Sequence, residues 1–108
     1  MINEYADVLK LMGDKTRLSI LKILDHTESC VCHFAELFDM SQSAVSQHMR
    51  RLKDAGLIKE DPQAQWIFYS LNKESAYYPF VKSILDRIPN DLVDIETVEA
   101  NLLEMSCP

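Results

Sequence analysis

A change of hydrophobic period near the middle of the chain constrains the fold most strongly. Apolar side chains recur three and four positions apart in residues 33–38 and again in the longer stretch 41–55, which predicts two helices separated by a tight turn. Gly56 then ends the helical pattern. The aromatic and β-branched residues of segment 57–69 predict a two-stranded hairpin with a polar tip at 61–63.

A short helix, a turn, a second helix and a hairpin follow one another in a winged helix-turn-helix. Further helices are predicted at 5–12 and 15–26, and at 80–87 and 92–105 near the other end. The chain contains only two glycines and four prolines among 108 residues, which argues against an all-β fold and its many tight turns. We therefore expect a mainly α fold with a small β-hairpin, as a single domain over residues 1–108.

The helix predicted at 15–26 is expected to form the centre of the core. Gly13 ends the preceding helix, and the Asp14 side chain is placed to cap the start of this one. Its apolar residues form a broad stripe. The charged residues expected outside that stripe are Lys15, Arg17, Lys22 and Asp25.

Several classes of protein are disfavoured by what the sequence lacks. No apolar stretch approaches the roughly 20 residues that cross a bilayer, and the start lacks a signal-peptide pattern, so we expect a cytoplasmic protein without membrane contact. A glycine-rich phosphate loop, a Ser-His-Asp set and an HExxH helix are also missing. The protein is therefore predicted not to be an enzyme.

The net charge of −6 is unevenly distributed. Residues 86–108 contain six acidic side chains against the single Arg87, whereas residues 41–60 contain four basic and two acidic side chains. Position matters more than the sum for nucleic-acid binding. The acidic end and the basic centre can therefore serve different partners.

The outer face of the helix at 41–55 consists of hydrogen-bond donors and contains no acid before Asp54. Glutamine can bond adenine through two hydrogen bonds, and arginine and lysine suit guanine or phosphate. This composition predicts contact with double-stranded DNA. The predicted DNA-binding residues are Ser41, Gln42, Ser43, Ser46, Gln47, His48, Arg50, Arg51 and Lys53.

Two closely spaced cysteines, Cys30 and Cys32, are the most distinctive chemical feature. Paired thiolates prefer soft ions such as As(III), Sb(III), Cd(II), Pb(II), Zn(II) or Cu(I). Side chains at i and i+2 point apart on a helix but share a face of an extended segment, so shared ligation requires non-helical backbone here. Cys107 is the only other thiol and is a candidate third ligand, while His33 is expected to be a surface or capping residue.

Five stretches together resemble the arsenic-repressor (ArsR/SmtB) family of metal-sensing transcriptional repressors, over roughly residues 5 to 72. They are DKTRL at 14–18, ESCVCH at 28–33, SQSAVSQH at 41–48, AGLI at 55–58 and FYSL at 68–71. The resemblance implies a homodimer that binds operator DNA and leaves it when an inducer binds. It also implies that Cys30 and Cys32 occupy the position of the family's metal motif.

The chain departs from the family pattern at several positions. Relatives usually have a glycine and a basic residue where Ala64 and Gln65 stand, and a proline where Lys15 stands. Arsenic-responsive relatives commonly have a third cysteine where this chain has Ala35. The first departure weakens the prediction that the hairpin contacts DNA, and the last leaves the third ligand open between Cys107 and His33.

The sequence therefore predicts a dimeric repressor that leaves DNA on binding As(III) or Sb(III) through Cys30, Cys32 and Cys107. A sensor of Cd(II), Pb(II) or Zn(II), a thiol-redox or persulfide-sensing repressor of the same fold, and a winged-helix protein-interaction module remain alternatives. The residues expected to form the dimer are Val8, Leu9, Met12, Leu92, Ile95, Val98, Leu102 and Leu103.

Overall fold

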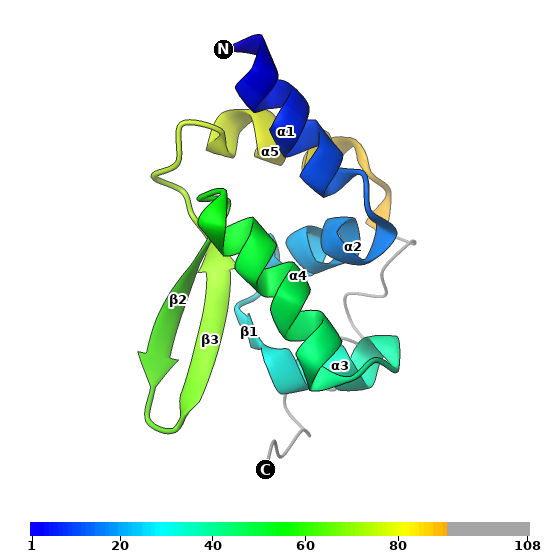
Figure 1. Ribbon diagram of the computed structural model, residues 1–108, viewed down its shortest axis with the longest axis vertical. Helices are drawn as coiled ribbons and strands as arrows, with labels where there is room; N and C mark the ends of the chain where they lie inside the picture. The colour runs from blue at the N-terminus through cyan, green and yellow to red at the C-terminus, as the bar shows by residue number, and fades with distance from the viewer. Residues whose placement is uncertain (91–108) are drawn as a thin grey trace.

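The computed structural model describes residues 1–90, which form a helical body with a projecting β-hairpin (Figure 1). The predicted mainly α fold with a small hairpin is confirmed. In chain order the elements are α1 (Ile2–Met12), α2 (Lys15–Leu24), β1 (Ser29–Cys30), α3 (Val31–Phe38), α4 (Gln42–Asp54), β2 (Ile58–Gln63), β3 (Trp66–Leu71) and α5 (Tyr78–Arg87). Helices α3 and α5 each begin two residues earlier than predicted.

The sheet has three antiparallel strands in the order β1-β3-β2, so the hairpin gains a short third strand that the sequence analysis did not predict. Ser29 lies opposite Tyr69, and Cys30 lies opposite Phe68. A two-residue strand has no periodicity of its own, because its position is determined by pairing with β3. The sheet therefore joins the cysteine segment to the hairpin.

The predicted polar tip at 61–63 is wrong, because these residues belong to strand β2. Gln63 pairs with Trp66, which places Ala64 and Gln65 in the turn. Ala64 has a φ of 56°, a left-handed conformation that favours glycine. Pro62 is tolerated within β2 because β2 is an edge strand of the sheet.

The helix boundaries follow the capping residues seen in the sequence. The Asp14 carboxylate accepts a hydrogen bond from the Arg17 backbone N–H at 3.0 Å, and the Ser41 hydroxyl accepts one from the Ala44 N–H at 3.1 Å. The Asp14 pKa is lowered, chiefly by that backbone hydrogen bond. Gly56 follows α4 with a φ of 79°, in the left-handed conformation that ends many helices.

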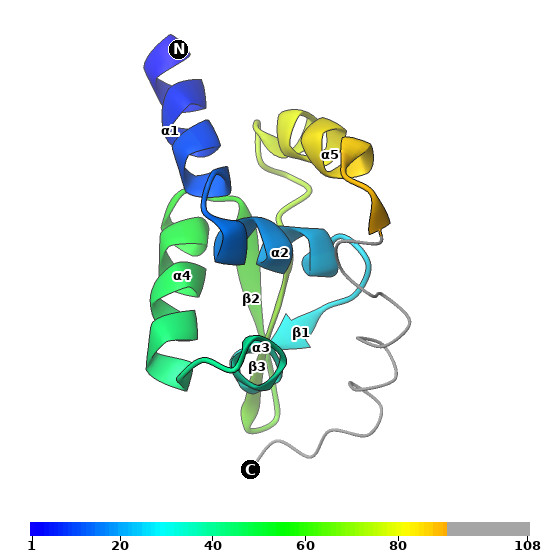
Figure 2. The ribbon, with the colours of Figure 1, turned by 90° about the vertical axis from the view of Figure 1, so that its right-hand side faces the viewer.

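The core lies where α2, α3 and α4 meet the sheet, and Phe34, Ile20 and Leu52 are fully buried in it. Figure 2 shows α4 along one edge of the molecule, with α2, α3 and the sheet on its other side. Asp39, whose φ is 53°, terminates α3 and turns the chain toward α4. The helix-turn-helix and its hairpin therefore share one core.

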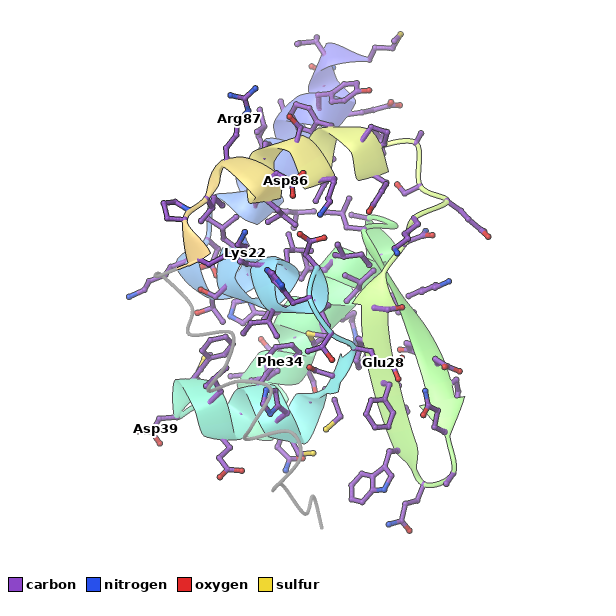
Figure 3. All side chains as sticks on the ribbon, turned by 180° about the vertical axis from the view of Figure 1, so that it is seen from behind. Lys22, Glu28, Phe34, Asp39, Asp86 and Arg87 are labelled. Atoms are coloured by element: carbon purple, nitrogen blue, oxygen red, sulfur yellow. The ribbon has the colours of Figure 1, made fainter. Side chains whose placement is uncertain are left out.

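Two charged residues predicted to lie outside the α2 stripe are buried, which corrects the sequence analysis. Arg17 is 9% exposed, and its Nε donates to the Leu11 carbonyl at 2.7 Å. Lys22 is 4% exposed, and its Nζ donates to the Leu85 carbonyl at 2.8 Å; Figure 3 shows Lys22 beneath α5. A backbone carbonyl of another helix accepts a hydrogen bond from each of these charged groups, which offsets part of the cost of burying it.

The predicted dimer residues divide between the core and the surface. Val8 and Met12 are buried in the core of the same chain, so they are not available to a second copy. Leu9 is 48% exposed. The helix predicted at 92–105 and its dimer residues lie outside the described residues. Among residues 1–90, every helix is too short or too polar to cross a membrane.

Candidate DNA-binding helix and thiol site

Helix α4 presents its predicted DNA-binding side chains on the face turned away from the core. Its apolar residues Val45, Met49 and Leu52 are buried, and all the predicted contacts except His48 are exposed. Within residues 1–90, Arg50 and Arg51 form no ion pair. The amphipathic pattern thus anchors one face of α4 and leaves hydrogen-bond donors on the other.

His48 is half-buried and faces α2. Its Nδ1 lies 3.3 Å from Nη1 of Arg17, whose guanidinium can only donate a hydrogen bond. In that contact Nδ1 is therefore the acceptor. Arg17 also bonds to the Leu11 carbonyl, so it links the end of α1 to the middle of α4. This orienting role was not anticipated from sequence.

The hairpin differs from α4 in its charge. Lys53 near the end of α4 forms an ion pair with Glu60 of β2, with 3.0 Å between Nζ and Oε1. Nearer the turn, the Gln63 amide donates to Asp61 at 2.9 Å. Ala64 and Gln65 in the turn carry no positive charge. The hairpin therefore offers little electrostatic attraction to a phosphate backbone.

The two cysteines of the CVC motif meet where strand β1 gives way to helix α3. Cys30 has extended backbone angles and is the N-cap residue of α3, whereas Cys32 already lies in the first turn of that helix. The two Sγ atoms are 2.8 Å apart. The non-helical backbone expected from the sequence is present at Cys30, whereas Cys32 is helical, and the two sulfurs are nevertheless close.

The two cysteines and the histidine that follows them differ in their exposure to solvent. Cys30 is buried and Cys32 is half-buried. His33 is 1% exposed, so the expectation of a surface position is wrong. Burial lowers the pKa of His33, which keeps its ring neutral at pH 7. The ring of His33 packs against Phe34.

Cys30 and Cys32 place two sulfurs side by side, and Cys32 is disulfide-bonded in this structure. Within residues 1–90, no group of three or more His, Cys, Asp or Glu side chains is arranged to hold a metal ion. Cys107, the predicted third ligand, lies outside the described residues. Two converging sulfurs suit a thiophilic ion, and a third ligand would have to come from elsewhere.

The helical spacing contained a signal for the buried Arg17 that the sequence analysis did not use. Arg17 precedes Ile20 by three positions and Leu21 by four, so it lies on the same side of α2 as these core residues. The pairing of Lys53 with Glu60 has no comparable local signal, because the register of β2 and β3 decides which side chains approach α4.

Comparison with known proteins agrees with this arrangement. Residues 14–60 match the model described as "Bacterial regulatory protein, arsR family". The arsenical resistance operon repressor of Bacillus subtilis (strain 168) is 33% identical over 75 residues, which cover 68% of this chain and 71% of that protein. A cadmium resistance transcriptional regulatory protein CadC homolog of Staphylococcus aureus is 35% identical, covering 66% of this chain and 60% of that protein.

The fold also matches solved structures. Reduced HlyU from Vibrio cholerae N16961 is similar with a TM-score of 0.71 and 31% identity, covering 84% of this chain and 90% of that one. The chain belongs to the arsR family of bacterial regulatory proteins. The family resemblance drawn from the five sequence stretches is therefore confirmed. Members of this family are winged helix-turn-helix transcriptional regulators and not enzymes.

Proposed function

We propose that two copies of this chain bind double-stranded operator DNA and place one α4 helix each in successive major grooves. The exposed donor face of α4, free of acidic residues before Asp54, supports this proposal. Two such helices bind half-sites about 34–36 Å apart, one DNA turn. The proposed contacts are Ser41, Gln42, Ser43, Ser46, Gln47, His48, Arg50 and Arg51, with Lys53 on the same face but paired with Glu60.

The proposed homodimer uses the outer face of α1. Met1, Ile2 and Leu9 are exposed apolar side chains on this helix, which projects from the body beside α5 (Figure 1). Burying such residues against a second copy would stabilise a small domain whose own core is modest. On this proposal the chain is one domain over 1–108, with terminal helices that serve dimerisation.

The proposed inducer is a soft ion held by Cys30 and Cys32 in the reduced protein, with As(III) or Sb(III) as the first candidates. The single observation that carries this proposal is the 2.8 Å approach of the two Sγ atoms at the bend between β1 and α3. The names of the B. subtilis and S. aureus relatives refer to arsenical and cadmium resistance, so Cd(II), Pb(II) and Zn(II) are the next candidates. Cys107 is the proposed third ligand.

The position of the sulfurs suggests how an ion would act on DNA binding. Cys30 lies in β1, which pairs with β3 of the hairpin, and Cys32 lies in α3, which packs on α4. An ion bound to both sulfurs would restrict the angle between β1 and α3 and thereby shift α4. A coupling free energy of about 1–3 kcal/mol would reduce operator affinity about 5- to 150-fold.

The test measures release of a fluorescent promoter fragment while each ion is titrated separately. The wild-type protein is expected to release the fragment with arsenite or antimonite, and Cys30→Ser and Cys32→Ser to bind DNA but keep it. Ser29→Ala is a matched control that leaves both sulfurs in place. Cys107→Ser reports whether the third thiol takes part. If the two serine variants respond to the same ion as the wild type does, the sensor site lies elsewhere.

A second candidate function is a repressor that senses thiol oxidation or persulfide formation. The short distance between the sulfurs favours it, and so does the similarity to a structure described as reduced HlyU. Hydrogen peroxide would take two electrons and two protons from two thiols, forming one disulfide and two waters. Thiol counting after peroxide, polysulfide or arsenite treatment distinguishes this function from ion binding.

A further inference from the structure

The three basic residues in the C-terminal half of α4 differ in their surroundings. Arg50 and Arg51 are exposed and form no ion pair with any described residue. Lys53 lies one turn further toward the hairpin, and its Nζ is 3.0 Å from Oε1 of Glu60. Although its side chain is 47% exposed, its ammonium group is turned toward the hairpin.

Glu60 is itself held in place by the sheet. The Tyr69 hydroxyl donates to the same Oε1 at 3.3 Å, and Tyr69 lies directly opposite Glu60 in the register of β2 and β3. Tyr69 is only 8% exposed. Burial, and then the neighbouring Glu60 carboxylate, raise the pKa of Tyr69, so its hydroxyl remains a donor at neutral pH. The hydrogen bond from the buried Tyr69 therefore helps to position the Glu60 carboxylate that pairs with Lys53.

The acidic residue next to Glu60 in the outer hairpin strand belongs to the other face of the sheet, because side chains alternate along a strand. Asp61 follows Glu60 in β2 and accepts a hydrogen bond from Gln63. The Gln63 amide also donates to Glu28 at 3.4 Å, and Figure 3 shows Glu28 beside the hairpin. Lys59 is the only basic residue within β2. A phosphate approaching Lys53 would therefore meet the Glu60 carboxylate, the one β2 carboxylate recorded on that side among the described residues.

We infer that Glu60 limits the operator affinity of this protein by holding Lys53 against the hairpin. In each protomer one positive charge is thereby withheld from the DNA backbone, and electrostatic contact is left to Arg50 and Arg51. This inference rests on the proposed function, because it concerns how α4 meets DNA. Exposed ion pairs are weak individually, so the restraint reduces affinity without preventing binding.

Salt dependence provides the measurement, since each phosphate neutralised on duplex DNA adds about 0.9 to the slope of log K against log salt concentration. Anisotropy of a labelled promoter fragment is followed from 50 to 300 mM KCl for the wild type, Glu60→Gln and the double variant Lys53→Gln/Glu60→Gln. Glutamine keeps an acceptor for Tyr69 and removes the charge. Thermal melting of each variant checks that it is folded.

Glu60→Gln is expected to bind roughly threefold to tenfold more tightly at 100 mM KCl, with a slope steeper by about 2 per dimer. The double variant removes one charge of each sign and is expected to lose the gain in affinity and slope that Glu60→Gln shows. Asp86→Asn is the matched control, because Asp86 pairs with Lys82 at 2.9 Å on α5, away from α4. It is expected to leave the slope unchanged.

Three outcomes overturn the inference. In the first, Glu60→Gln leaves affinity and slope at the wild-type values. In the second, Asp86→Asn raises affinity as much as Glu60→Gln does, which would mean that the effect comes from net charge alone. The double variant could lose affinity and slope relative to the wild type, which would show that Lys53 already contacts phosphate. If the wild-type protein does not bind the promoter fragment even at 50 mM KCl, the proposed function itself is wrong. A failure of the inference alone leaves wild-type binding intact, so the two failures are distinguishable.

Discussion

Helix α4 and the hairpin that follows it belong to one DNA-binding motif, yet they differ in charge and in anchoring. The helix buries Val45, Met49 and Leu52 and exposes basic and polar side chains. In β2 only Ile58 is buried, and the strand exposes two acids and one lysine. If α4 binds DNA as proposed, this difference predicts that DNA affinity comes from the helix, while the hairpin completes the core and pairs with Lys53.

The largest contrast is expected in stability. Leu52→Ala in α4 should lower the free energy of unfolding by about 2–5 kcal/mol, because it leaves a cavity beside fully buried neighbours. Ile67→Ala in β3 should change it by less than about 1 kcal/mol, because Ile67 is 46% exposed. Denaturant unfolding at one fixed protein concentration measures both. Equal losses would contradict the assignment of α4 as the better-anchored region.

The next contrast concerns operator affinity. Arg51→Ala should weaken binding by about 1–3 kcal/mol, or about 5- to 150-fold, because it removes from the proposed DNA face an exposed cation that forms no ion pair within residues 1–90. Gln65→Ala in the hairpin turn should have an effect of less than about twofold, since its side chain has no charge. Anisotropy titrations measure the operator affinity of both variants. A larger loss for Gln65→Ala would assign DNA contact to the hairpin.

The N-cap of α4 is expected to have a smaller effect. Ser41→Ala removes the acceptor for the Ala44 N–H and should destabilise the protein by about 1 kcal/mol. Ser43→Ala removes another exposed serine hydroxyl from the first turn and leaves this cap in place, so stability should be nearly unchanged. Thermal melting compares the two variants. Similar melting temperatures for both would mean that the cap contributes nothing measurable.

The smallest expected effect is a gain of stability in the hairpin. Ala64→Gly should stabilise the fold by a few tenths of a kcal/mol up to about 1 kcal/mol, because glycine adopts the left-handed φ of 56° without steric cost. Gln65→Gly is the control and should destabilise, since among the non-glycine residues of 1–90 only Asp39 and Ala64 have positive φ. A melting temperature for Ala64→Gly below the wild-type value would refute strain at this turn.

Much of the fold was predictable because its signals are local. The spacing of Phe34, Leu37 and Phe38 predicted α3, and Ser41 and Gly56 marked the limits of α4. The hairpin tip was predicted at 61–63, but these residues belong to β2, whose edge position, which tolerates Pro62, could not be known from sequence.

The candidate site was predicted by residue type and less well by environment. The spacing of Cys30 and Cys32 indicated a shared thiol site, but the sequence did not show that an extended residue just before α3 brings their sulfurs together. His33 was expected at the surface and is buried. Burial of a histidine depends on which elements pack over it, and this packing cannot be predicted from the residues of one helix turn.

The sequence by itself determined the helical periods, the caps, the family and the chemistry of the thiols, because each depends on residues close together in the chain. Only the tertiary structure decided that Arg17 and Lys22 lie inside, that β1 joins the hairpin, and that Glu60 engages Lys53. These are contacts between elements distant in sequence. The geometry of these contacts depends on how the helices and the sheet pack together, so it cannot be predicted from any short segment of the sequence.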